Sequence, residues 1–155
     1  MTTLAEQVTN SPAETERVGM LLGERLQPGD VVLLTGELGA GKTTFVRGVA
    51  QGTGSRAEVA SPTFQLVRVY PGRVQLAHVD LYRVESSSEL RDLGLEELAE
   101  NGAVVVEWGD RLLSSPLGGE VAPKATEGLD QYALIELKHM GGDRRLIRTK
   151  RDLRH

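Results

Sequence analysis

The chain has 155 residues, with 18 basic and 22 acidic side chains, 18 glycines and no cysteine. This length favours one domain that buries a core of its own. Without cysteine there is no disulfide framework, no thiolate zinc site, no iron–sulfur cluster and no cysteine nucleophile. The first 30 residues hold several acidic side chains and no long apolar run. We therefore expect a cytoplasmic protein with no signal peptide and no membrane-spanning helix.

Charge divides the chain into two unlike parts. Residues 1–143 carry a net charge of −9, whereas residues 144–155 carry +5. We expect a single domain over residues 1–150 and a basic, frayed end at residues 151–155. The favoured interpretation of the basic segment is a solvated strand, and contact with an acidic partner surface is the alternative.

The N-terminal third predicts a helix, a strand and a second helix. Residues 11–26 have helical spacing of apolar side chains, with Ser11 as the N-cap of a capping box. The short apolar run at residues 31–34 is typical of a buried parallel strand. Helical spacing returns at residues 42–52, so a glycine-rich loop joins a strand to a helix.

Two hairpins, two short helices and a second buried strand are expected in the remainder of the chain. The predicted hairpins pair residues 63–70 with 74–79 and residues 132–138 with 145–149; the helices are 86–93 and 96–100, the strand is 103–106, and 114–130 is a loop. Glycine in the interior of a helix or strand is unfavourable. We therefore attribute most of the glycine excess to turns and loops.

The glycine-rich loop matches a known phosphate-binding pattern. Residues 36–43 read GELGAGKT, which fits G-x-x-x-x-G-K-[ST] between a strand and a helix. Its backbone N–H groups would converge on phosphate oxygens at the helix N-terminus. Lys42 would contact the β and γ phosphates and Thr43 would offer a hydroxyl to Mg²⁺. The expected nucleotide contacts here are Gly36, Glu37, Leu38, Gly39, Ala40, Gly41, Lys42, Thr43 and Thr44.

The loop motif between a strand and a helix therefore predicts an α/β P-loop NTPase fold. Such a site needs a carboxylate at the end of a neighbouring strand. Asp80 and Glu107 both end apolar runs, and ligands of open α/β sheets bind at this edge. His78 is interpreted as a packed or hydrogen-bonded histidine. Trp108 is interpreted as half-buried packing, with a role in the site left open.

Two further patterns bear on the nucleotide. Ser61-Pro62-Thr63 is either a plain turn or a mobile segment that senses the γ-phosphate. The chain has no Asn-Lys-x-Asp string, the usual guanine-reading signature, and this favours ATP.

Four segments together closely resemble the bacterial TsaE family. They are GELGAGKTTFVRG at 36–48, SPTF at 61–64, HVDLYR at 78–83 and VEW at 106–108. The family consists of small ATPases required for the threonylcarbamoyl modification of the adenosine beside the tRNA anticodon. The resemblance implies a P-loop domain with a mixed, mostly parallel sheet flanked by helices and with antiparallel hairpins. It also implies ATP with Mg²⁺ as cofactors, and TsaB and TsaD proteins as partners, with tRNA reached through that complex.

Residue roles carried over from the family are expectations for this chain. By resemblance, Lys42 and Thr43 hold phosphate and metal, while Asp80 and Glu107 serve the metal and the attacking water. Thr63 belongs to a switch-like segment, Trp108 sits beside the site, and the helix start around Ser11 approaches the adenine.

The leading hypothesis is an ATPase that drives a cycle in a tRNA-modifying assembly. We see no arginine clearly placed to neutralise the transferring phosphoryl group, so we expect weak turnover alone and stimulation by partners. A small-molecule phosphotransferase and an ATP-gated binding module that does not require hydrolysis are the alternatives. Primary nucleic-acid binding is disfavoured by the negative net charge and the small number of aromatic side chains.

Overall fold

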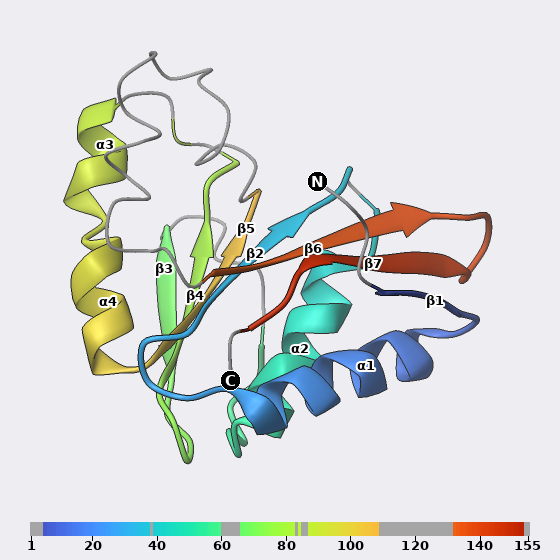
Figure 1. Cartoon of the computed structure of the whole chain (residues 1–155), viewed down its shortest axis with the longest axis horizontal. Helices are drawn as coiled ribbons and strands as arrows, with labels where there is room; N and C mark the ends of the chain where they lie inside the picture. Colours follow the sequence, from blue (N-terminus) through green and yellow to red (C-terminus); the bar gives the residue numbers. More distant parts are fainter. Residues whose placement is uncertain are drawn as a thin grey trace.

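The computed structural model describes residues 5–37, 39–59, 66–82, 84, 87–108 and 132–153 (Figure 1). Its strands are β1 (Ala5–Thr9), β2 (Val31–Thr35), β3 (Val67–Tyr70), β4 (Leu76–Asp80), β5 (Ala103–Glu107), β6 (Tyr132–His139) and β7 (Arg145–Arg151). Its helices are α1 (Pro12–Arg25), α2 (Lys42–Gly52), α3 (Ser87–Asp92) and α4 (Leu95–Asn101). No described helix has the length and apolar character needed to cross a membrane.

The described strands form one sheet in the order β1-β7-β6-β2-β5-β4-β3. The centre is parallel, because β2 pairs with both β6 and β5, and β5 pairs with β4. The outer pairs are antiparallel at both edges. This confirms the predicted α/β fold with a mixed sheet.

Most predicted elements are present, with small shifts at their ends. Both expected hairpins form, as β3 with β4 and β6 with β7. The Ser11 half of the predicted capping box at the start of α1 is present, because Ser11 Oγ accepts from the Glu14 N–H at 3.1 Å; the Glu14 carboxylate instead accepts from the N–H of Asn10, one residue before the N-cap, at 3.1 Å. The sequence pattern missed β1, which is short and mostly exposed. The proposed cap at Ser86 and the predicted loop at 114–130 lie outside the described residues.

Helices cover both faces of the sheet. On one face, α1 and α2 pack over a core cluster that includes Phe45, Val49, Val105 and Ile135. On the other face, α4 packs over a second cluster drawn from β2, β4 and β5. Figure 1 shows α1 and α2 side by side beneath β6 and β7, and α3 and α4 beyond the β3–β4 edge.

Helices α1 and α2 approach closely because glycines line their contact. The glycines at this contact are Gly19 and Gly23 of α1 and Gly48 and Gly52 of α2. A Cβ atom on Gly48, for instance, would collide with the carbonyl oxygen of Glu16. Our attribution of the glycine excess mainly to turns was therefore incomplete, since helix packing requires part of it.

The C-terminal segment packs further than its charge pattern indicates. Strand β7 runs to Arg151, past the expected boundary at residue 150, and Leu153 is buried in the core. Asp152 pairs with Arg25 of α1 at 3.3 Å. Strand pairing and apolar burial thus place residues 151–153, which we expected to belong to the frayed end, against the domain.

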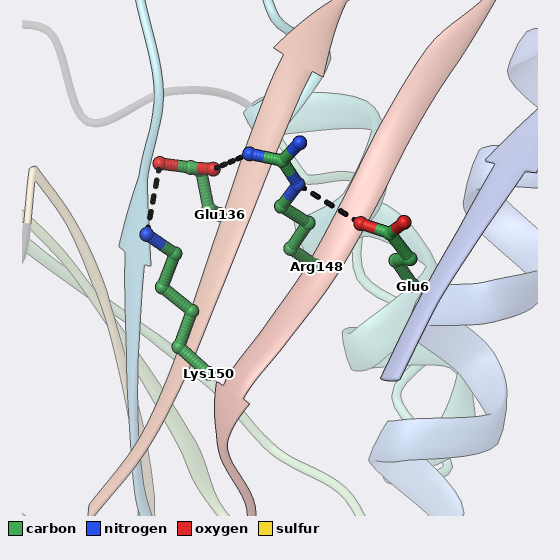
Figure 2. A network of polar contacts seen from close by, with 4 residues as sticks. All are labelled: Glu6, Glu136, Arg148 and Lys150. Atoms are coloured by element: carbon green, nitrogen blue, oxygen red, sulfur yellow. Dashed lines mark hydrogen bonds and ion pairs between the residues drawn. The ribbon is translucent and has the colours of Figure 1, made fainter. Parts of the chain in front are cut away.

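Charged side chains tie β1 to β7 and β6 (Figure 2). Arg148 contacts Glu6 of β1 at 3.1 Å and Glu136 of β6 at 3.4 Å. Lys150 reaches the second carboxylate oxygen of Glu136 at 3.6 Å. Part of the positive charge of the C-terminal segment is thus neutralised by acidic side chains of the domain itself.

Candidate functional site

The glycine-rich loop has a backbone shape that glycine makes possible. Gly36 and Gly41 have φ angles of 144° and 93°, in the region that other residues disfavour. A Cβ on Gly36 would also collide with the carbonyl oxygen of Leu137. Lys42 is the first residue of α2, and its buried ammonium donates to the Gly36 carbonyl oxygen at 2.5 Å. The loop thus leads directly into a helix N-terminus, where anions are favoured. Leu38, another predicted contact, lies outside the described residues.

Sheet register brings the two predicted acids together. Asp80 ends β4 and stands opposite Glu107, which ends β5, while Glu107 stands opposite Leu34 of β2. Because the three strands are parallel, their carboxyl ends and the loop after β2 share one edge of the sheet. Side chains alternate between faces along a strand. Leu76 and Val105 belong to the core beneath α1 and α2, so Asp80 and Glu107 point to that same side.

The two acids have different surroundings. Asp80 is partly exposed, and its Oδ1 accepts from the Tyr82 N–H at 2.9 Å. Glu107 is buried, and its Oε2 lies 2.5 Å from Nε2 of the fully buried His78. The prediction of a hydrogen-bonded His78 is confirmed, and its partner is one of the predicted site acids.

Trp108 lies over the loop lysine. Lys42 Nζ is 3.3 Å from the centroid of the Trp108 ring, and the Tyr82 ring packs against Trp108 at a tilt of 37°, with the ring centroids 5.0 Å apart. Trp108 has a φ of 62°, and it is the one described residue other than glycine with positive φ. Such strained backbone is concentrated at functional sites, where the surrounding structure holds it. Of the two interpretations of Trp108, contact with the site is the one the geometry favours.

Arg145 is a candidate site residue that our sequence reasoning missed. An ideal Cβ on Gly41 would lie 3.4 Å from Arg145 Nε, which is buried with no hydrogen-bond partner among the described residues. Its Nη1 donates to the carbonyl oxygens of Gly142 and Arg144, which hold the guanidinium at the hairpin turn. No sequence motif marks this arginine. It lies near the glycine-rich loop only because β7 is paired into the sheet at this place.

The start of α1 also approaches the loop. A small hollow of about 30 Å³ is lined by Pro12, Thr15, Gly41, Thr44, Asp143 and Arg145. Ser11 itself, the predicted adenine contact, caps α1 through its hydroxyl. Thr63 lies outside the described residues.

The described donor set suits Mg²⁺ held together with phosphate. Thr43, Asp80 and Glu107 offer hydroxyl and carboxylate oxygens, the ligands that hard cations prefer. Among the described residues, no group of three or more His, Asp or Glu side chains could hold a metal ion alone. Mg²⁺ commonly takes one or two carboxylates and completes its shell with substrate phosphates and water. The residues present therefore fit a metal–nucleotide site better than a metal site without nucleotide.

Comparison with known proteins identifies a family for this chain. Residues 9–145 match the family described as "Threonylcarbamoyl adenosine biosynthesis protein TsaE". The tRNA threonylcarbamoyladenosine biosynthesis protein TsaE of Treponema pallidum is 45% identical over 108 residues, covering 69% of this chain and 80% of that protein. The Bacillus subtilis protein of the same name is 46% identical over 102 residues, covering 64% of this chain and 63% of that protein.

A solved structure shares the fold as well. The crystal structure of Bacillus subtilis YdiB superposes with a TM-score of 0.70 at 33% identity, covering 94% of this chain and 83% of that one. The residues that match the family model include the loop and both strand-end acids, and the match ends at Arg145, the first residue of β7. The chain belongs to the TsaE family of threonylcarbamoyl adenosine biosynthesis proteins.

Proposed function

We propose that this protein is a Mg²⁺-dependent ATPase that serves formation of threonylcarbamoyladenosine in tRNA. The observation that carries the proposal is the meeting of three groups at one sheet edge: the glycine-rich loop with Lys42, the carboxylate of Asp80, and the carboxylate of Glu107. This combination is used for phosphoryl transfer from nucleoside triphosphates.

Each group has a role in this proposal. The loop N–H groups and Lys42 bind the phosphate oxygens, and Thr43 and the two acids supply oxygen ligands to the metal. Bound Mg²⁺ would neutralise charge on the β and γ phosphates. Glu107 would orient the attacking water and accept its proton, since this acid stands directly beside the end of β2.

The partners in the proposal are TsaB-like and TsaD-like proteins. The names of the relatives place those proteins in tRNA threonylcarbamoyladenosine biosynthesis. An ATPase that does not itself transfer a group to tRNA would act in this process within a complex. Arg145 is held at the hairpin turn by two carbonyl oxygens, so we expect slow ATP turnover by the isolated chain and stimulation by the partners.

Calorimetric titration with Mg·ATP tests the binding step. Lys42→Ala should lose measurable ATP binding and keep the fold, because it removes the loop's charge from the helix N-terminus. Arg47→Ala, an exposed position on the same helix, is the matched control and should bind ATP as the wild type does. Equal affinity of the Lys42→Ala and wild-type proteins would refute the proposed site.

Reconstitution tests the function itself. Modification of tRNA by the TsaB-like and TsaD-like proteins should require this chain and ATP, and should fail with a non-hydrolysable ATP analogue. Asp80→Asn and Glu107→Gln should bind ATP and fail to support modification. Full modification with the analogue would instead indicate an ATP-gated binding module.

A further inference from the structure

The His78–Glu107 pair is a polar contact inside an apolar layer. The side chain of His78 is 0% exposed and that of Glu107 is 5% exposed. Neighbouring side chains on the same strands, such as Leu76 and Val105, belong to the hydrophobic core. Apolar residues of similar volume are often as stabilising as a buried charged pair, or more so, so core stability does not account for this one.

The proposed role of Glu107 fixes the direction of this hydrogen bond. As a metal ligand or a base, Glu107 must be a carboxylate, which can only accept, so this role requires the proton of the contact on Nε2 of His78. The other ring nitrogen, Nδ1, is buried and has no hydrogen-bond partner among the described residues. Within that part of the chain, His78 is also the sole hydrogen-bond partner of the Glu107 side chain. One carboxylate oxygen is therefore held, and the other, Oε1, takes no hydrogen bond from a described residue.

We propose that His78 is a positioning residue: its Nε2–H holds Oε2 of Glu107, so that Oε1 is presented to the metal and the attacking water. The inference rests on the proposed ATPase function and deepens it. His78 lies two residues before Asp80 on β4, so the two side chains are on one face of the sheet. Parallel pairing of β4 with β5 puts the Glu107 side chain on that same face. Partners that orient ligating side chains in this way are a general feature of metal sites.

Two substitutions at this position separate orientation from packing. His78→Leu fills the space and removes the donor, whereas His78→Gln keeps an N–H donor. His78→Leu should lower kcat for ATP hydrolysis by roughly 10- to 100-fold with KM for ATP nearly unchanged, the range seen when outer-shell partners are removed. His78→Gln should recover most of the loss. A kcat of His78→Leu within twofold of wild type, or an equal loss in both variants, would overturn the inference.

A double-mutant cycle adds a second criterion that folding defects cannot imitate. If His78 acts through Glu107, adding His78→Leu to Glu107→Gln should cause no further loss of kcat. Losses that multiply across the two substitutions would show that His78 acts independently of Glu107, and this result would also overturn the inference.

The ligand-free protein provides a readout that does not depend on activity. With ¹⁵N-labelled histidine, NMR should show one exchange-protected Nε2–H signal among the three histidines of the chain. The signal should be absent in His78→Gln and should lose its protection in Glu107→Ala. A His78 ring protonated at Nδ1 alone would contradict the inference. Failure of the wild type to bind or hydrolyse ATP would refute the proposed function, whereas an active wild type with an equally active His78→Leu variant refutes only this inference.

Discussion

The ammonium of Lys42 lies 3.3 Å from the centroid of the Trp108 ring and also donates to the carbonyl oxygen of Gly36. A cation over an indole face is stabilised by the ring quadrupole. The lysine that would bind phosphate is thus held by the protein itself, between an aromatic face and the first glycine of the loop. Phosphate binding must draw Nζ towards the phosphate oxygens, and this changes the environment of Trp108.

Trp108 should therefore report nucleotide binding by its fluorescence. It is the only tryptophan of the chain, so the whole tryptophan signal comes from the ring beside Lys42. Addition of Mg·ATP should change the emission with the same saturation curve that calorimetry gives. Lys42→Ala should alter the emission before any ligand is added and should not respond to ATP. An unchanged spectrum at a concentration where calorimetry shows saturation would contradict this prediction.

Arg145 should contribute to nucleotide affinity. Its buried Nε has no described partner and lies beside Gly41 at the start of α2. A hydrogen bond to a charged group contributes about 1.5–3 kcal/mol, so Arg145→Ala should raise the Kd for ATP about tenfold or more. Arg144→Ala removes the exposed arginine next to it and should leave Kd unchanged. Equal Kd values for the two variants in calorimetry would show that Arg145 is only a hairpin residue.

Gly48→Ala should be strongly destabilising. The added methyl would meet the backbone of α1 at Glu16, where no flexible side chain can give way, and the two helices would have to separate. Overpacking of this kind costs about 1–3 kcal/mol, occasionally more. Urea unfolding followed by circular dichroism measures the change, with Arg47→Ala on the exposed side of α2 expected to shift stability by less than about 0.5 kcal/mol. An unfolding midpoint equal to wild type would mean that the helices are not in close contact.

Arg148→Met should loosen β1 without unfolding the domain. Arg148 stands opposite Glu6 in the β1–β7 register and bridges it to β6 (Figure 2). Partly exposed ion pairs are weak, so we expect a loss of about 0.5–1 kcal/mol, smaller at high salt. Hydrogen exchange of the β1 amides should become faster. Lys138→Met, an exposed position on β6, is the control; equal exchange rates in the two variants would argue against the bridge.

Local patterns predicted most of the elements because their causes are local. The N-cap at Ser11, the apolar runs of β2 and β5, and the turn between β3 and β4 depend on neighbours in sequence. Strand β1 could not be predicted in this way. It is five residues long and mostly exposed, and it exists as a strand because β7 supplies its hydrogen-bond partners.

The features of the candidate site also separate into those with local causes and those that depend on distant residues. The loop motif and the two strand-end acids are evident in the sequence, because a phosphate cradle needs contiguous residues and parallel strands end in one place. Three contacts were not evident in the sequence, because each joins residues far apart along the chain: Lys42 with Trp108, His78 with Glu107, and Arg145 with Gly41.

By itself, the sequence determined the fold class, the glycine-rich loop and the acids at the ends of the neighbouring strands, because motif spacing and apolar periodicity encode them directly. Tertiary structure alone decided which residues the other glycine and arginine residues contact. Glycines meet across α1 and α2, and the basic C-terminal segment becomes β7, with Arg145 towards the loop and Arg148 towards two glutamates. The physical reason is that strand order and register, set by burial of the whole sheet, choose which distant residues become neighbours.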